Sequence, residues 1–503
     1  MAQSTQKPLL DSSRRTRSYR SRNIIIAVAL LFNILWLLQA WISQDVESSP
    51  DIARVQRCAI NNLHANLSFL DGATPISEDE FLERRDRLAR ALVASDVDAF
   101  VLEPGYTFQY YGNISQGDWE PWEPEERPFL MVILPVTSES GSISAKTAFL
   151  APHFEEGRVR MLGIPSREPK LDIVTWEEHW DPYDTLLRSH IFAGSDAYVH
   201  GRKPRLMVDE ELRDFIARGL ANAGFETFGL SPEAELVKQL KSPAEVEILR
   251  AVNTGTVAAV RSMRPCLMPG LTEDEVRGIL DTSLLSVGFA LFFNIVLFEE
   301  DGALPHGGFI VGKKKLNHET MVVIDVGAHY LGYSSDICRS FLIDPEAKES
   351  ETCWTLITSF LVKMNLFPRS IQVSKGNSKL HEEKLKVWDI VLQAQTAAAK
   401  KLKVNNTAAS VDLAARGIIE EAGYGHAFTH RLGHGIGIKA HESPYLNKWN
   451  VKAVLRDGMT FTNEPGIYLE GKFGVRHEDV YLVVDGGEAE LLTGRRATGP
   501  YDP

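Results

Sequence analysis

Residues 430–442 read His-Arg-Leu-Gly-His-Gly-Ile-Gly-Ile-Lys-Ala-His-Glu, and this stretch decides how the whole chain is interpreted. It places three histidines, His430, His434 and His441, within twelve positions. The glycines between them carry no side chain, so the backbone can approach a site closely and can adopt positive φ angles. A single histidine is more often a hydrogen-bonded polar residue than a ligand. Three histidines arranged in this way favour a metal or catalytic site.

Acidic residues lie on both sides of this stretch. Asp325 ends an apolar run, and Asp336 follows it eleven positions later. If the two lie on the strands of one hairpin, their carboxylates can face each other, and a buried carboxylate requires compensation such as a metal ion. The alternative for this pair alone is one aspartate in a turn and one on the surface. Downstream, Glu464 lies at the end of a predicted strand. Glu478 belongs to a short run of charged residues within another predicted strand that is otherwise apolar.

Two aspartates, one histidine and two glutamates in this order resemble the five-ligand site of the dinuclear metallopeptidases with the pita-bread fold. The resemblance covers residues 77–503. A further domain precedes the motifs. The chain therefore resembles one branch of these peptidases in particular, that of aminopeptidase P, prolidase and creatinase. The resemblance implies an α+β fold, with a pita-bread catalytic domain after a smaller α/β creatinase-type domain. The implied ligands are Asp325, Asp336, His434, Glu464 and Glu478, of which Asp336 and Glu478 bridge the two ions.

The resemblance also implies roles for residues around the ligands. His306, His441 and Glu464 correspond to the catalytic residues, and His430 and Arg476 correspond to substrate-binding residues. An arginine such as Arg476 can also fix a ligand carboxylate through a bidentate pair.

The ligand types suggest the chemistry. Carboxylates and an imidazole, without thiolates, suit a hard or borderline ion, so we expect Mn²⁺, with Co²⁺ or Zn²⁺ as alternatives. Two ions ~3.5–4 Å apart can share a water and lower its pKa, and Glu464 can accept its proton. The branch implies a metallopeptidase acting on Xaa-Pro bonds at peptide amino termini or in dipeptides. Two alternatives stay open: a pita-bread binding protein without turnover, and a metal-independent C–N hydrolase of the creatinase kind, although creatinase lacks these ligands.

Length and charge narrow the class of protein further. A chain of 503 residues is too long for one hydrophobic core, so two or more domains are expected. The net charge is −13, and residues 1–22 hold six basic residues against one acidic residue, a balance of +5 that leaves −18 for the remainder. Such an acidic body is a poor candidate for binding nucleic acid or anionic lipid. The peptide substrate that we expect is implied by the resemblance.

The amino terminus predicts a membrane anchor. Residues 24–42 are almost entirely apolar and would span ~29 Å as a helix, close to the hydrocarbon thickness of a bilayer. The arginines before them predict a cytosolic tail over 1–23 and a lumenal or extracellular body in a single-pass protein. A cleaved signal peptide is the alternative. Three glycosylation sequons, at Asn66, Asn113 and Asn405, fit a glycoprotein with this topology, and Cys58 and Cys266 could pair in an oxidising compartment.

The remaining pattern predicts the domain layout. We expect a stalk without periodicity over 43–76, an amino-terminal α/β domain over 77–230 and the catalytic domain over 231–503. Residues 350–382 interrupt the catalytic domain as an irregular insertion, which is either a surface segment or translated intron. A homodimer is compatible with the sequence.

Overall fold

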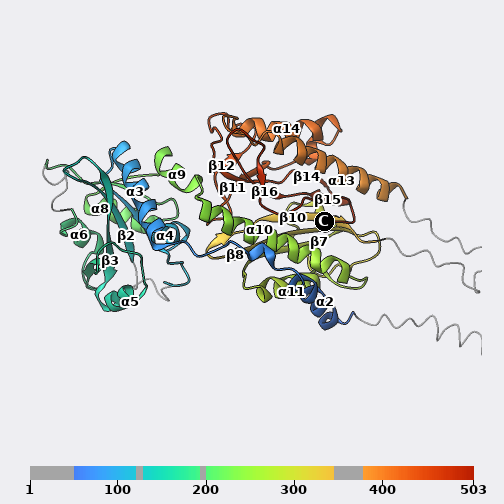
Figure 1. The fold of residues 1–503 in the computed structure, drawn as a ribbon, viewed down its shortest axis with the longest axis horizontal. Coiled ribbons are helices and arrows are strands. Elements are labelled where there is room, and N and C mark those ends of the chain that lie inside the picture. The colour runs from blue at the N-terminus through green and yellow to red at the C-terminus, as the bar shows by residue number, and fades with distance from the viewer. Residues whose placement is uncertain (1–49, 120–127, 193–199, 345–377) are drawn as a thin grey trace, which may run out of the picture. The chain divides into compact units, whose positions relative to one another are not determined.

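The structure is a computed structural model that describes residues 50–119, 128–192, 200–344 and 378–503 (Figure 1). Residues Ile52–Pro503 form one compact unit. The predicted anchor at 24–42 lies outside the described residues. Within the ranges that are described, no helix combines the length and the apolar character needed to cross a bilayer.

The first part of the compact unit is built on a six-stranded sheet in the order β4-β3-β2-β1-β5-β6. Strands β1, β2 and β3 pair antiparallel, whereas the pairs β1–β5, β3–β4 and β5–β6 are parallel. The strands are β1 (Ala99–Leu102), β2 (Leu130–Thr137), β3 (Ile143–Pro152), β4 (Asp172–Trp176), β5 (Arg205–Val208) and β6 (Glu226–Phe228). The helices around them are α3 (Glu78–Ala94), α4 (Tyr106–Gly112), α5 (Glu156–Met161), α6 (Pro182–Arg188) and α8 (Asp214–Ala223). Every residue of β1 is buried, as a central strand covered on both faces requires.

Local sequence signals fix the helices that follow, α9 (Pro232–Gln239), α10 (Pro243–Met263) and α11 (Glu273–Ser286). Complete capping boxes form at Ser242 and Thr272, at the starts of α10 and α11. At Ser77, before α3, only half of such a box forms. The Ser77 side chain accepts from the Glu80 N–H, but the Glu80 carboxylate accepts from Arg84 and Ser242 instead.

The carboxy-terminal part of the unit, where the catalytic domain was expected, contains two sheets and a hairpin. One sheet has the order β10-β8-β7, with β9 paired to β8, and the other has the order β12-β11-β13-β16-β17. The strands of the first sheet are β7 (Ala290–Phe298), β8 (Met321–Tyr330), β9 (Tyr333–Ser334) and β10 (Ile337–Leu342). The later strands are β11 (Gly433–Gly435), β12 (Glu442–Leu446), β13 (Thr460–Asn463), the hairpin β14 (Gly466–Leu469) and β15 (Phe473–Arg476), β16 (Asp479–Leu482) and β17 (Glu490–Leu491).

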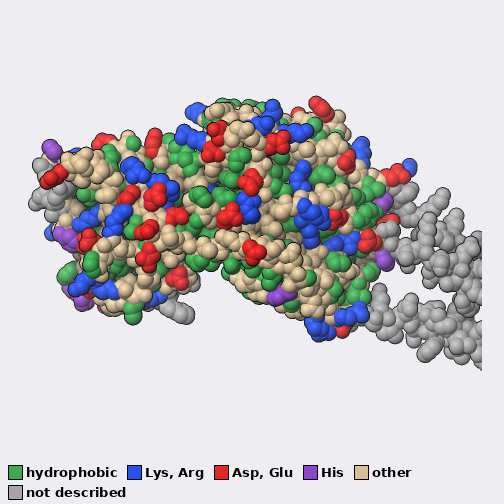
Figure 2. Space-filling view, viewed as in Figure 1, with side chains coloured by type: hydrophobic (Ala, Val, Ile, Leu, Met, Phe, Trp, Pro, Cys, Tyr) green, Lys and Arg blue, Asp and Glu red, His purple; other side chains and the backbone are tan. Residues whose placement is uncertain are grey.

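Helices cover these sheets. Helices α13 (Ser378–Ala399) and α14 (Ala408–Glu421) lie side by side along one face of the later strands (Figure 1). Their apolar residues share one core cluster with β13, β14, β15 and β16, while α10 and α11 share another with β7, β8 and β10. On the surface, acidic and basic side chains are interspersed over the visible face (Figure 2).

Two predicted boundaries were wrong. Residues 43–76 are not a stalk throughout, because helix α2 (Ile52–His64) packs Val55, Ala59 and Leu63 into the core beside α10 and α11. These residues recur every four positions, a helical period that the surrounding polar residues obscure. The insertion predicted over 350–382 is also too long at its end, because α13 already begins at Ser378 and Leu380 packs against the core. Residues 345–377 lie outside the described residues.

Candidate metal centre

One cavity of about 410 Å³ collects the side chains that the sequence singled out. It lies between the two sheets of the catalytic part, and the amino-terminal domain contributes Tyr106 to its wall. The predicted residues that line it are His306, Asp325, Asp336, His430, His434, His441, Glu464, Arg476 and Glu478. Residues separated by more than 170 positions in the sequence therefore converge on one site.

The two aspartates come from the paired strands β8 and β10, although only Asp325 lies within its strand. Asp325 lies in β8 opposite Cys338 of β10, and Asp336 immediately precedes β10. Both side chains are buried. The backbone N–H of Asp336 donates to Oδ1 of Asn253, 3.2 Å away on α10, which fixes the end of the hairpin. Asp325 Oδ1 is buried and has no hydrogen-bond partner among the described residues.

His434 and Glu464 come from neighbouring strands of the second sheet. His434 lies in β11, and Glu464 directly follows β13. Their nearest side-chain atoms, Nε2 and Oε1, are 3.3 Å apart. Thr462 connects them, because its hydroxyl accepts from the His434 N–H at 3.1 Å and donates to Glu464 Oε1 at 3.3 Å. No side chain larger than hydrogen fits at Gly433, where a Cβ would lie 2.1 Å from the Thr462 carbonyl oxygen.

Glu478 is held through its backbone. Its N–H donates to the Cys338 carbonyl oxygen at 3.0 Å, and its own carbonyl accepts from Nη1 of Arg339 at 2.5 Å. Arg339 is buried and pairs with the buried Asp479 at 2.5 Å. This network ties β10 to β16 and leaves the Glu478 carboxylate directed into the cavity.

The ligand atoms form three overlapping groups, and within each group all atoms lie within 4.8 Å of one another. The groups are Asp325, Asp336 and Glu478; His434, Glu464 and Glu478; and Asp336, His434 and His441. Glu478 belongs to the first two groups and Asp336 to the first and third. These shared carboxylates are the two that the resemblance assigns to bridging positions.

The electrostatics of these residues fit cations. Burial, together with the charge of Asp325, raises the pKa of Asp336 well above its usual value. Burial and the charge of Asp336 do the same to the pKa of Glu478. Burial opposes ionisation of Glu464 as well, but the hydrogen bond and charge of His434 lower its pKa to about 2. The site thus holds several buried carboxylates that repel one another, and one of their oxygens has no hydrogen-bond partner among the described residues. Divalent ions bound by these oxygens would offset the repulsion.

Arg476 is placed differently from the substrate-binding role that the resemblance implied. It is buried, and its guanidinium donates to Asp325 Oδ2, to the Tyr468 hydroxyl at 2.7 Å and to the Pro305 carbonyl at 2.9 Å. Its position therefore favours orientation of the Asp325 carboxylate, which is the second role considered from sequence.

The other histidines surround the ligands. His441 is partly exposed, its Nε2 lies 3.4 Å from Asp336 Oδ2, and its ring centroid is 4.2 Å from that of His434. His306 is exposed at the cavity. His430 Nε2 lies 2.9 Å from the Tyr468 hydroxyl, and burial lowers the pKa of His430 to about 4, so its ring is neutral at pH 7.

Sequence reasoning missed two groups of cavity residues. The first is Arg431, which stands inside the quoted motif directly after His430, so its position was a usable signal. Its guanidinium lies 5.1 Å from the Tyr445 ring centroid, and its buried Nε has no hydrogen-bond partner among the described residues. The second group is the apolar wall of Tyr106, Phe292, Phe293 and Ile295, which only the tertiary fold brings to the site.

Comparisons with known proteins find similar sequences and structures. The model of a protein family described as "Metallopeptidase family M24" matches this sequence over residues 247–361 and 369–485. An uncharacterized peptidase of Schizosaccharomyces pombe is 36% identical over 486 residues, covering 96% of this chain and 94% of the relative. The Xaa-Pro dipeptidase of Pyrococcus horikoshii is 32% identical over 260 residues, covering 51% of this chain and 63% of that protein. The crystal structure of recombinant prolidase from Thermococcus sibiricus superposes with a TM-score of 0.63 at 26% identity, covering 84% of this chain and 98% of that one.

Proposed function

We propose that this chain, which belongs to metallopeptidase family M24, uses two divalent metal ions to hydrolyse Xaa-Pro bonds in short peptides. The observation that carries the proposal is the overlap of two ligand groups, Asp325 with Asp336 and His434 with Glu464, each completed by Glu478. None of these groups gathers all five ligands, and two groups that share Glu478 are the arrangement that two neighbouring ions would use. Mn²⁺ is the ion we propose on the basis of the oxygen-rich donor set.

The surrounding residues have defined tasks in this proposal. When bound, the two ions would lower the pKa of the attacking water and stabilise negative charge on the scissile carbonyl oxygen. Glu464, which lines the cavity, would accept a proton from the water and pass it to the leaving amine nitrogen. His306 and His441, both lining the cavity, would donate hydrogen bonds to the carbonyl oxygen and hold the peptide in place.

The preference for proline is supported by the cavity wall and by the relatives. Tyr106, Phe292, Phe293 and Ile295 give the cavity an apolar side suited to a pyrrolidine ring. The Pyrococcus relative is named an Xaa-Pro dipeptidase, and the Thermococcus neighbour is a prolidase.

Arg431 favours dipeptides over longer peptides. Its guanidinium lines the cavity, stacks near Tyr445 and leaves Nε without a partner among the described residues. A free α-carboxylate in the cavity could pair with this guanidinium, and a dipeptide carries its carboxylate one residue from the scissile bond. We therefore propose Arg431 as the anchor for the substrate carboxylate.

The proposal includes attachment to a membrane through residues 24–42, with the catalytic body on the non-cytosolic side. This part rests on the sequence alone, as does a homodimer. A full-length protein that carbonate releases from membranes would contradict the anchor.

The activity is tested with the purified body of the protein, which lacks the proposed anchor at residues 24–42. The substrates are Xaa-Pro dipeptides, the same dipeptides with an amidated C-terminus, and Xaa-Ala dipeptides. Hydrolysis of free Xaa-Pro dipeptides that requires added Mn²⁺ and stops with chelator is expected. Hydrolysis is also measured in two matched variants, Asp336→Asn in the site and Asp389→Asn on the exposed face of α13. A loss in the first variant alone shows that the effect comes from the site and not from removing any carboxylate. Turnover that survives both chelation and Asp336→Asn would favour the metal-independent alternative. Bound metal without turnover of any peptide would favour the binding protein.

A further inference from the structure

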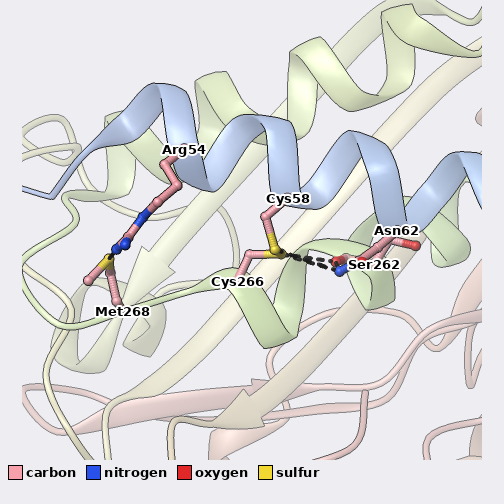
Figure 3. Close-up of a disulfide and its surroundings, with 6 residues drawn as sticks. All are labelled: Arg54, Cys58, Asn62, Ser262, Cys266 and Met268. Carbon is pink, nitrogen blue, oxygen red and sulfur yellow. Dashed lines mark hydrogen bonds between the residues drawn. A yellow bond between two sulfur atoms is a disulfide. The ribbon is translucent and has the colours of Figure 1, made fainter.

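A disulfide joins the amino-terminal helix to the catalytic part. Cys58 of α2 is bonded to Cys266, which lies just after α10, and their Cα atoms are 6.0 Å apart across a sequence separation of 208 residues (Figure 3). Asn62, one turn after Cys58, donates to the Ser262 carbonyl oxygen at 3.1 Å. Because α2 is already packed against α10 and α11, the two cysteines meet without displacing either helix.

A structural disulfide of this kind indicates an oxidising compartment, since cytosolic thiols are kept reduced. Its formation from two thiols releases two protons and two electrons, which a disulfide-bearing oxidant of the folding compartment accepts. Cys338, the other described cysteine, is free and buried. The compartment that forms such disulfides in eukaryotic cells is also the one that attaches glycans to Asn-X-Ser/Thr sequons.

The three sequon asparagines lie where a glycan can be accommodated. Asn66, Asn113 and Asn405 are all exposed, and each lies in a connection between elements. Asn113 and Asn405 have positive φ angles of 58° and 70°, which belong to turns. The Asn66 side chain accepts from the Ser68 N–H at 3.0 Å, a local Asx turn on the surface. Two asparagines with fully buried side chains, Asn253 and Asn463, are not in sequons.

We propose that Asn66, Asn113 and Asn405 are acceptors of N-linked glycans on a body that matures in an oxidising compartment. In each case the side-chain Nδ2 forms a bond to C1 of the first sugar of a polyprenyl-diphosphate oligosaccharide. The bond between C1 and the phosphate oxygen breaks, the polyprenyl diphosphate leaves, and the amide nitrogen loses one proton. This proposal rests on the disulfide and on the exposure of the three asparagines, and it is independent of the peptidase activity.

The glycans would leave the catalytic cavity open, because none of the three asparagines lines it. Asn66 follows α2, Asn113 ends α4, and Asn405 lies between α13 and α14. The modification and the hydrolysis can therefore be measured separately.

The test uses the full-length protein purified from eukaryotic cells. Peptide N-glycosidase converts a glycosylated asparagine to aspartate, and peptide mass spectrometry then shows which positions were modified. We expect conversion at Asn66, Asn113 and Asn405, and a stepwise gain in electrophoretic mobility in the variants Asn66→Gln, Asn113→Gln and Asn405→Gln. The control Asn222→Gln, at an exposed asparagine of α8 outside any sequon, is expected to keep the wild-type mobility.

The mass measurement on the wild-type chain decides the outcome without requiring any variant to fold. An unconverted asparagine removes that position from the proposal, and the absence of conversion at all three overturns it, whatever the state of Cys58 and Cys266. Alkylation before and after reduction reports the disulfide on the same sample. Recovery of both cysteines as free thiols would overturn the assignment of the compartment.

Discussion

Arg476 donates from Nη2 to Oδ2 of Asp325, and only 2% and 8% of the two side chains are exposed. The pair connects β15 to β8 at the wall of the cavity, so a residue from the β14–β15 hairpin orients a proposed ligand from the sheet that contains β8. The second oxygen of Asp325 is left without a partner among the described residues and is available to a cation. Residues that hold a ligand in this way commonly change metal affinity by 10–100-fold when they are replaced.

Replacing Arg476 should therefore weaken the metal site rather than the binding of peptide. Arg476→Lys keeps the charge but loses the forked guanidinium, so we expect about a 10–100-fold loss of metal affinity with a fall in kcat. Metal titration by calorimetry measures the first effect. Arg218→Lys is the matched control, because Arg218 pairs with Asp214 on an exposed helix face, where such pairs contribute little. An Arg476→Lys protein with unchanged metal affinity and a raised KM would instead support contact with substrate.

Arg431 gives a prediction about substrate length. Arg431→Gln should raise KM for free Xaa-Pro dipeptides and lower kcat/KM by about 10–100-fold, the range expected for losing a hydrogen bond to a charged group. Hydrolysis of the C-terminally amidated dipeptide, which has no carboxylate to lose, should change little. Steady-state kinetics on the two substrates separates these effects. Equal losses on both would show that Arg431 does not bind the carboxylate.

The disulfide gives a prediction about stability. Closing a loop across 208 residues restricts the unfolded chain and commonly contributes about 2–4 kcal/mol. We expect the double variant Cys58→Ser and Cys266→Ser to unfold at a lower temperature than the wild type in differential scanning calorimetry. Reductant should lower the Tm of the wild type toward that of the variant and leave the variant unchanged. A wild-type Tm that does not respond to reductant would contradict a stabilising disulfide.

Glu273 gives a prediction about pH. Burial raises the pKa of Glu273 to about 7, against the opposing hydrogen bonds from Gly312 and Phe298, and Asp301 adds to the rise. Between pH ~4.5 and 7 the carboxyl group of Glu273 is ionised in the unfolded chain but stays protonated in the folded protein. The contribution of Glu273 to the free energy of unfolding therefore falls as the pH rises. Allowing for solvent screening, the fall should be about 1 kcal/mol.

Thermal unfolding across this pH window measures the slope. In Asp301→Asn the slope should be shallower, because one charge that raises the pKa of Glu273 is gone. Glu300→Gln is the control, since Glu300 also pairs with Lys314 but does not act on Glu273. Identical slopes in wild type and Asp301→Asn would contradict the coupling.

The proposed ligands could be singled out in the sequence because the family signal is local. Each ligand stands in a short motif whose glycine, proline or strand context is visible in sequence, and the structure brings all five to one cavity. Tyr106 could not be predicted, because its position depends on how the amino-terminal domain packs against β8 and β9. Helix α2 was missed because only three of its residues are buried, and they are spaced among polar ones. The start of α13 was misplaced because polar residues 378–379 precede its first apolar contact at Leu380.

The central claim is that Asp325, Asp336, His434, Glu464 and Glu478 hold two ions that are required for hydrolysis. It is tested most directly by elemental analysis of the purified protein together with its Xaa-Pro hydrolysis, in the wild type and in Asp336→Ala. We predict two metal ions per wild-type chain. Removing a shared carboxylate should lower the metal content and abolish turnover. Two ions per chain and unchanged hydrolysis in Asp336→Ala would contradict the account.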